Sequence, residues 1–106
     1  MLDDQAVELV VPDGANAPTV VLRGEIDVQF AAKLSTCFET ALRARPSQIV
    51  IDMTELTFID STGLNPFVSA EKRLRENGGH LVISHPPPMA RRVLEVSGLT
   101  EVFTIH

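Results

Sequence analysis

The chain has 106 residues, of which 44% are hydrophobic and 22% charged, with a formal net charge of −5. This length and composition predict one globular domain spanning residues 1–106 and exclude an intrinsically disordered chain. The acidic balance argues against nucleic acid as a direct partner, because binding to phosphates needs a basic surface.

The N-terminal part of the chain predicts two strands joined by a short loop. Residues 7–11 are apolar apart from one glutamate, and residues 19–24 are rich in β-branched side chains. Between them, residues 12–16 contain proline, aspartate, glycine and asparagine, which favour a turn. This arrangement is typical of a β-hairpin.

A helix is predicted over residues 28–45. Asp27 can cap its start and Pro46 can end it. Its apolar residues repeat at helical spacing and predict one buried face: Phe30, Leu34, Cys37, Phe38 and Ala41. Cys37 is the only cysteine, so no internal disulfide can form, and we interpret it as a small buried side chain.

The middle of the chain predicts a strand followed by a second helix. Residues 48–53 include a continuous apolar run, which favours a central strand buried on both faces. Residues 62–77 show helical spacing, with Pro66 in the first turn, where a missing N–H costs little. Gly78-Gly79 predicts a helix end with a positive φ.

The C-terminal part adds a strand, a helix and a last strand. We predict strands over residues 80–84 and 101–105, and a helix over residues 89–97 that Gly98 caps. The predicted order is therefore β-β-α-β-α-β-α-β, an α/β fold with helical crossovers between strands.

The residues between the third strand and the second helix carry the strongest functional signal. Here Ser61 lies between Asp60 and Thr62 at a predicted helix start. Such a start has unpaired N–H groups and a partial positive charge, so it accepts a capping hydroxyl or a phosphate. Two interpretations of Ser61 follow: a helix cap or a phosphorylation site, and the residues alone favour the cap.

Three segments together resemble the STAS domain family, and within it the bacterial anti-sigma factor antagonists. They are residues 22–27 (LRGEID), residues 50–53 leading into 58–64 (VIDM and FIDSTGL), and residues 92–99 (RVLEVSGL). The resemblance covers nearly the whole chain. It implies a STAS-like mixed sheet of four to five strands with helices packed mainly on one face.

The resemblance also implies a regulator that binds proteins and has no catalytic activity, cofactor or metal of its own. Its partner would be an anti-sigma factor with ATP-dependent serine kinase activity, and a serine phosphatase is a further expected partner. Ser61 matches the serine that this kinase phosphorylates. The unphosphorylated antagonist would bind the anti-sigma factor and so free a sigma factor for transcription.

The expected partner-binding residues surround this serine: Asp27, Asp60, Ser61, Thr62, Gly63 and Leu64. Several of them have a second interpretation. Asp27 is a helix cap or a contact residue beside Ser61. Asp60 orients the serine hydroxyl, shapes the kinase's substrate pocket or belongs to a turn. Leu64 is an interface anchor or a core residue.

Two features depart from the family's pattern. The family continues with glycine after Leu64, where this chain has Asn65-Pro66, which could alter the kinase's approach. The family also has a further C-terminal helix after the last strand, where this chain stops at His106. Either that helix is absent or the chain is truncated.

Two other functions compete with this prediction. A hydrolase triad could combine Ser61 with Asp60 and a histidine, but the Gly-x-Ser-x-Gly pattern of such enzymes is absent. A zinc site is not predicted either, because no Cys/His cluster has zinc spacing. A non-phosphorylated STAS scaffold, or a small subunit of a transporter or signalling complex, is the main alternative. No N-terminal signal or membrane-length apolar run is present, so we expect a cytoplasmic protein without a membrane partner. The sequence leaves the oligomeric state open.

Overall fold

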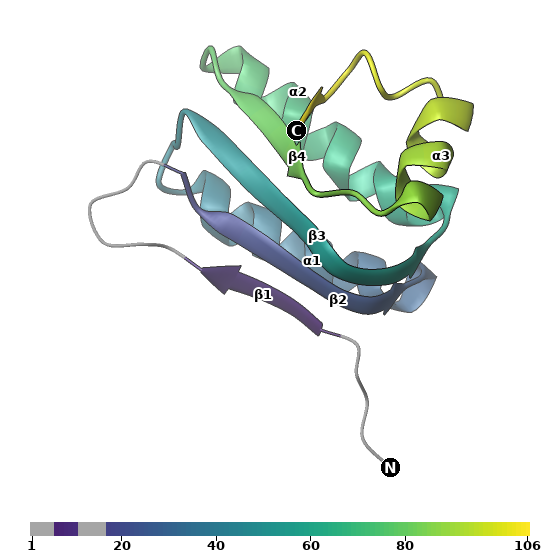
Figure 1. Ribbon diagram of the computed structural model, residues 1–106. Helices are drawn as coiled ribbons and strands as arrows, with labels where there is room; N and C mark the ends of the chain where they lie inside the picture. The colour runs from purple at the N-terminus through teal and green to yellow at the C-terminus, as the bar shows by residue number, and fades with distance from the viewer. Residues whose placement is uncertain (1–5, 11–16) are drawn as a thin grey trace.

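The computed structural model describes residues 6–10 and 17–106, which form a five-stranded sheet with three helices (Figure 1). The predicted loop at residues 12–16 lies outside the described residues. The strands are β1 (Ala6–Val10), β2 (Thr19–Ile26), β3 (Gln48–Ile59), β4 (His80–Ser84) and β5 (Thr104–Ile105). The helices are α1 (Val28–Leu42), α2 (Asn65–Glu76) and α3 (Pro88–Val96), and a 3₁₀ turn, η1 (Ser61–Leu64), precedes α2.

The strands follow one another across the sheet in chain order. Strand β1 pairs with β2 antiparallel, and the pairs β2–β3, β3–β4 and β4–β5 are parallel. Each parallel step is made through a helix, the usual crossover between parallel strands. Figure 1 shows α1 and α2 behind the sheet and α3 beside the end of β3. The predicted element order and the mixed sheet with helices mainly on one face are confirmed.

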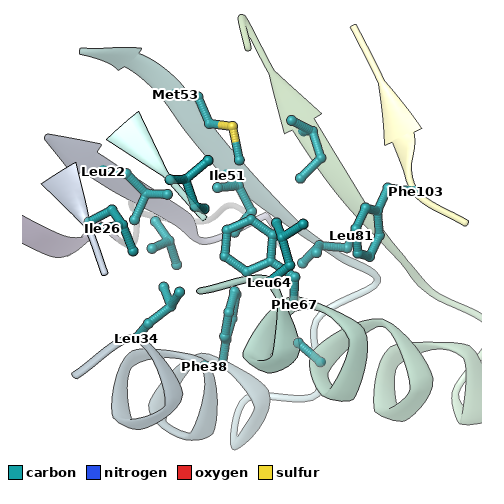
Figure 2. Close-up of a cluster of buried hydrophobic side chains, with 14 of the residues drawn as sticks. Leu22, Ile26, Leu34, Phe38, Ile51, Met53, Leu64, Phe67, Leu81 and Phe103 are labelled. Atoms are coloured by element: carbon teal, nitrogen blue, oxygen red, sulfur yellow. The ribbon is translucent and has the colours of Figure 1, made fainter. Parts of the chain in front are cut away.

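The core lies between the sheet and the helices α1 and α2. Figure 2 shows the Phe67 ring between Phe38 of α1 and Phe103, which precedes β5. The ring centroids lie 5.7 Å from Phe38 and 6.2 Å from Phe103, both in edge-on arrangements that aromatic pairs favour. The predicted apolar face of α1 is buried except for Cys37, which is half-buried, and this burial raises the pKa of its thiol.

The central strand β3 differs from its prediction in two ways. It continues to Ile59 rather than ending near residue 53, because its second half pairs with β2 as far as Ile26. Ile51 and Met53 are buried on one face, but Val50 on the other face is only half-buried. Burial on both faces was therefore the wrong prediction, since the helices α1 and α2 cover one face.

Several other predicted boundaries move, among them the end of the second strand, which continues to Ile26 rather than stopping at residue 24. Helix α1 ends at Leu42, not at residue 45, where Arg45 has a positive φ of 50° that no helix continues through. Helix α2 starts only at Asn65, after the 3₁₀ turn. The last strand shrinks to two residues, because the N–H groups of Val102 and Phe103 bond back to the Leu99 carbonyl as a turn. The positive φ expected at Gly78 is present, at 78°.

A buried carboxylate connects α2 to the sheet. Glu71 is 2% exposed, and its Oε1 accepts a hydrogen bond from the Leu81 N–H of β4 at 2.7 Å. Its Oε2 accepts from Arg75 Nε at 2.5 Å. Both oxygens are thus paired, as a buried charge requires. Among the described helices, none is long and apolar enough to cross a membrane.

Replacing Glu71 by alanine is expected to destabilise the fold by about 1–3 kcal/mol, because the buried Leu81 N–H loses its acceptor. Urea unfolding followed by circular dichroism would measure this change. Glu76→Ala is the matched control, since Glu76 is exposed on the same helix. Equal midpoints for the two variants would contradict a structural role for Glu71.

Candidate functional site

The candidate site is built where β2 and β3 end side by side. Ile26 and Ile59 are paired in register, and Asp27 and Asp60 follow them directly. The carboxyl ends of parallel strands share one edge of a sheet, so the two carboxylates emerge at the same edge. Asp27 caps α1, because its Oδ1 accepts a hydrogen bond from the Gln29 N–H at 3.0 Å. The predicted cap is confirmed, and it occupies the same edge as Asp60.

Asp60 caps the turn η1. Its Oδ1 accepts hydrogen bonds from the Gly63 N–H at 3.0 Å and from the Thr62 hydroxyl at 2.5 Å. The Thr62 bond first, and then the Gly63 bond, lower the pKa of the Asp60 carboxyl below its usual range. The sequence alone favoured Ser61 as the helix cap, and that prediction is wrong. The cap is Asp60.

Ser61 is the first residue of η1, and its side chain is exposed. Its hydroxyl has no hydrogen-bond partner within residues 6–10 and 17–106. The interpretation that Asp60 orients this hydroxyl is wrong, because the carboxylate binds Thr62 instead. Ser61 thus presents an unengaged nucleophilic oxygen at the surface, while the neighbouring Thr62 hydroxyl is occupied.

Gly63 and Leu64 point the other way, into the protein. A Cβ on Gly63 would lie 3.2 Å from Ile59 Cγ1 and 3.3 Å from the Ile26 carbonyl oxygen, so only glycine fits there without displacing a neighbour. Leu64 is 2% exposed and belongs to the cluster in Figure 2. Of its two interpretations, core packing holds, and an interface anchor at Leu64 is excluded by its burial.

A groove of about 500 Å³ opens beside Ser61, between the end of β3 and the helix α3. It is lined by Phe58, Asp60, Ser61, Arg92 and Val96, together with other residues of α3. Phe58 is 42% exposed and Val96 is 81% exposed, so the groove offers apolar surface next to the serine. Phe58, Arg92 and Val96 were not predicted as site residues, although residues 92–99 carried part of the family pattern.

A second hollow, of about 400 Å³, lies on the α2 side of Ser61 and includes Asn65, Val68 and Leu99. Pro66 is buried in the first turn of α2, where its missing N–H is tolerated. The departure from the family pattern therefore places an exposed amide, Asn65, at this hollow and leaves the helix intact.

Exposed apolar side chains concentrate at this edge of the molecule. Within the described residues, the large hydrophobic side chains that are exposed are Val28, Phe58, Val68 and Val96. Val28 follows the Asp27 cap, and the others line the two hollows beside Ser61. Exposed apolar side chains that gather beside polar groups are typical of a surface that binds another protein.

The histidines do not assemble a triad with Ser61. His80 begins β4, near Glu71, while His85 Nδ1 pairs with the Ser84 hydroxyl at 2.7 Å. His106 follows β5, and none of the three lines the hollows beside Ser61. In the part of the chain that is described, no cluster of three or more His, Cys, Asp or Glu side chains could hold a metal ion.

Comparisons with known proteins agree with this arrangement. The STAS domain model matches residues 6–106. The anti-sigma-B factor antagonist of Listeria monocytogenes is 34% identical over 86 residues, which is 81% of this chain and 75% of that protein.

Two solved structures are similar in fold. An anti-sigma factor antagonist from Mycobacterium paratuberculosis superposes with a TM-score of 0.81 at 25% identity, covering 95% of this chain and 86% of that one. The phosphorylated form of the Bacillus cell fate determinant SpoIIAA gives a TM-score of 0.74 at 22% identity, covering 95% and 91%.

The cap assignment predicts unequal effects of two neighbouring substitutions. Asp60→Ala is expected to lower the free energy of unfolding by about 0.5–2 kcal/mol, because η1 loses its cap. Ser61→Ala is expected to change it by less than about 0.5 kcal/mol, since its hydroxyl is exposed and caps nothing. Urea unfolding would measure both changes. If Ser61→Ala lowered the free energy of unfolding more than Asp60→Ala does, Ser61 would be the capping residue and this assignment would be wrong.

The lowered pKa of Asp60 also predicts a pH dependence. A carboxyl whose pKa is lower in the folded state stabilises the fold fully above its unfolded pKa of about 4. This contribution is lost as the pH falls through the lower folded pKa. The stability difference between wild type and Asp60→Ala should therefore be constant from pH 7 to 5 and shrink below pH 4. A difference that grows on acidification would contradict this sign.

Proposed function

The chain belongs to the STAS domain family, and we propose that it acts as an anti-sigma factor antagonist switched by phosphorylation of Ser61. One domain spanning residues 1–106 would do this by binding alone, without catalysis or a cofactor of its own. The observation that carries the proposal is the exposed, unengaged Ser61 hydroxyl beside an apolar groove. The names of the relatives support the anti-sigma factor as the partner.

In the unphosphorylated state, the partner would dock over the Ser61 edge. The exposed apolar side chains around Ser61 supply surface that such an association buries, and the carboxylates of Asp27 and Asp60 supply polar contacts beside it. The anti-sigma factor would then be held by this protein, and its sigma factor would be free for transcription in the cytoplasm.

The same partner would act as an ATP-dependent serine kinase. A kinase needs a hydroxyl that can enter its active site and lose its proton. Ser61 meets this need, while the Thr62 hydroxyl is held by Asp60 at 2.5 Å. The geometry therefore favours Ser61 over its neighbour as the phosphate acceptor. A serine phosphatase would return the protein to its binding state.

Phosphorylation would act directly on the interface. It adds about −1.5 to −2 charges and three acceptor oxygens to the exposed end of η1. Asp60 already places a carboxylate beside this position. A partner docked over the groove would have to bury a dianion next to a like charge, which weakens binding without a change of fold.

Substitutions at Ser61 should separate the two states. Ser61→Ala is expected to bind the anti-sigma factor as tightly as wild type, and Ser61→Asp at least about tenfold more weakly, because it places a negative charge in the interface. Isothermal titration calorimetry would measure both affinities, after the partner has been captured with Ser61→Ala as bait and identified.

Ser35→Asp is the matched control, because it adds the same charge at an exposed site that lines a separate hollow between α1 and α2. It should bind like wild type. If Ser61→Asp also binds like wild type, the switch is contradicted, and a non-phosphorylated scaffold or a transporter subunit becomes the better function.

A further inference from the structure

A phosphate on Ser61 would find few free donors in its own turn. The Gly63 N–H already bonds to the Asp60 side chain and backbone oxygen, at 3.0 and 3.1 Å. The Thr62 hydroxyl also donates to the Asp60 carboxylate. The nearest charge along the chain is therefore repulsive, and a cation from another element would offset it.

Helix α3 supplies one across the groove. Arg92 is exposed and lines the same groove as Ser61 and Asp60. Met89, Arg92 and Val96 line it together, at a spacing that puts them on one face of the helix.

Arg92 also differs from the arginines that already hold partners. Arg23 pairs with Glu55, Arg73 with Glu39 and Arg75 with Glu71. Arg92 forms no ion pair within the described part of the chain, so its guanidinium is available to a new anion. A guanidinium can bind two phosphate oxygens at once, which makes it the preferred side chain for this task.

We propose that Arg92 binds the phosphate of phosphorylated Ser61, so that the modified residue is held across the groove between β3 and α3. This inference rests on the proposed phosphorylation of Ser61. If so, the phosphate would do more than repel a docking partner. The ion pair with Arg92 would also cover the apolar surface of Phe58 and Val96. Phosphorylation would thus close the docking groove from within the molecule.

The test uses full-length protein with phosphoserine installed at position 61 during synthesis, so that it does not depend on a kinase. The second ionisation of a phosphoserine has a pKa near 6 and is lowered by a nearby cation. Phosphorus NMR titration should therefore give a pKa about half a unit or more higher in Arg92→Gln than in wild type. Arg92→Lys, which keeps the charge, should restore most of the shift.

Arg91→Gln is the matched control, because Arg91 is exposed on the same helix but does not line the groove. This substitution removes one positive charge, as Arg92→Gln does, and should leave the phosphoserine pKa at its wild-type value. Asp60 and Asp27 are unchanged in all variants, so their repulsion of the phosphate affects every phosphoserine pKa equally and does not contribute to the differences. The Arg92 Nε–H resonance should also shift on phosphorylation in wild type.

Equal titrations for Arg92→Gln and Arg91→Gln, with an unmoved Arg92 resonance, would overturn the inference. That outcome would leave the proposed function standing, because binding to the anti-sigma factor and modification of Ser61 are measured separately. Conversely, failure of the anti-sigma factor to distinguish Ser61→Asp from wild type would overturn the proposed function without changing the titration.

Discussion

The site depends on the two hydrogen bonds that the Asp60 carboxylate accepts from Thr62 and Gly63. They satisfy the start of η1, and they occupy the donors that would otherwise bind the neighbouring hydroxyl. Ser61 is therefore left exposed and unengaged at the first position of the turn. A switch residue needs both properties, since a kinase must reach the oxygen and a partner must sense the added charge. One carboxylate provides both.

The scaffold around this turn comes from the parallel pairing of β2 and β3. Because Ile26 and Ile59 are in register, the caps of α1 and η1 emerge at one edge. Gly63 allows the turn to pack against both isoleucines, and the burial of Leu64 anchors it in the core. Phosphorylation can then change the surface while the interior keeps its packing, which suits control by direct exclusion rather than by rearrangement.

Local patterns predicted much of this from the sequence. The bounds of β4, the Asp27 cap and the positive φ of Gly78 could be predicted from short stretches of sequence, and they are confirmed. The length of β3 was missed because its second half is a strand only through pairing with β2. The cap was misassigned because Asp60 and Ser61 are both good capping residues, and only geometry separates them. The groove was missed because it joins β3 to α3, about thirty residues later.

The most direct test is to map the phosphate on the protein isolated from its own host by intact-mass and fragment-ion spectrometry, beside a Ser61→Ala variant. One phosphate on Ser61, with Thr62 unmodified and the variant unphosphorylated, is the expected result, because Asp60 holds the Thr62 hydroxyl and leaves that of Ser61 unengaged. Phosphate on Thr62, or an unmodified protein under every growth condition, would contradict the central claim that Asp60 leaves Ser61 free to act as the switch.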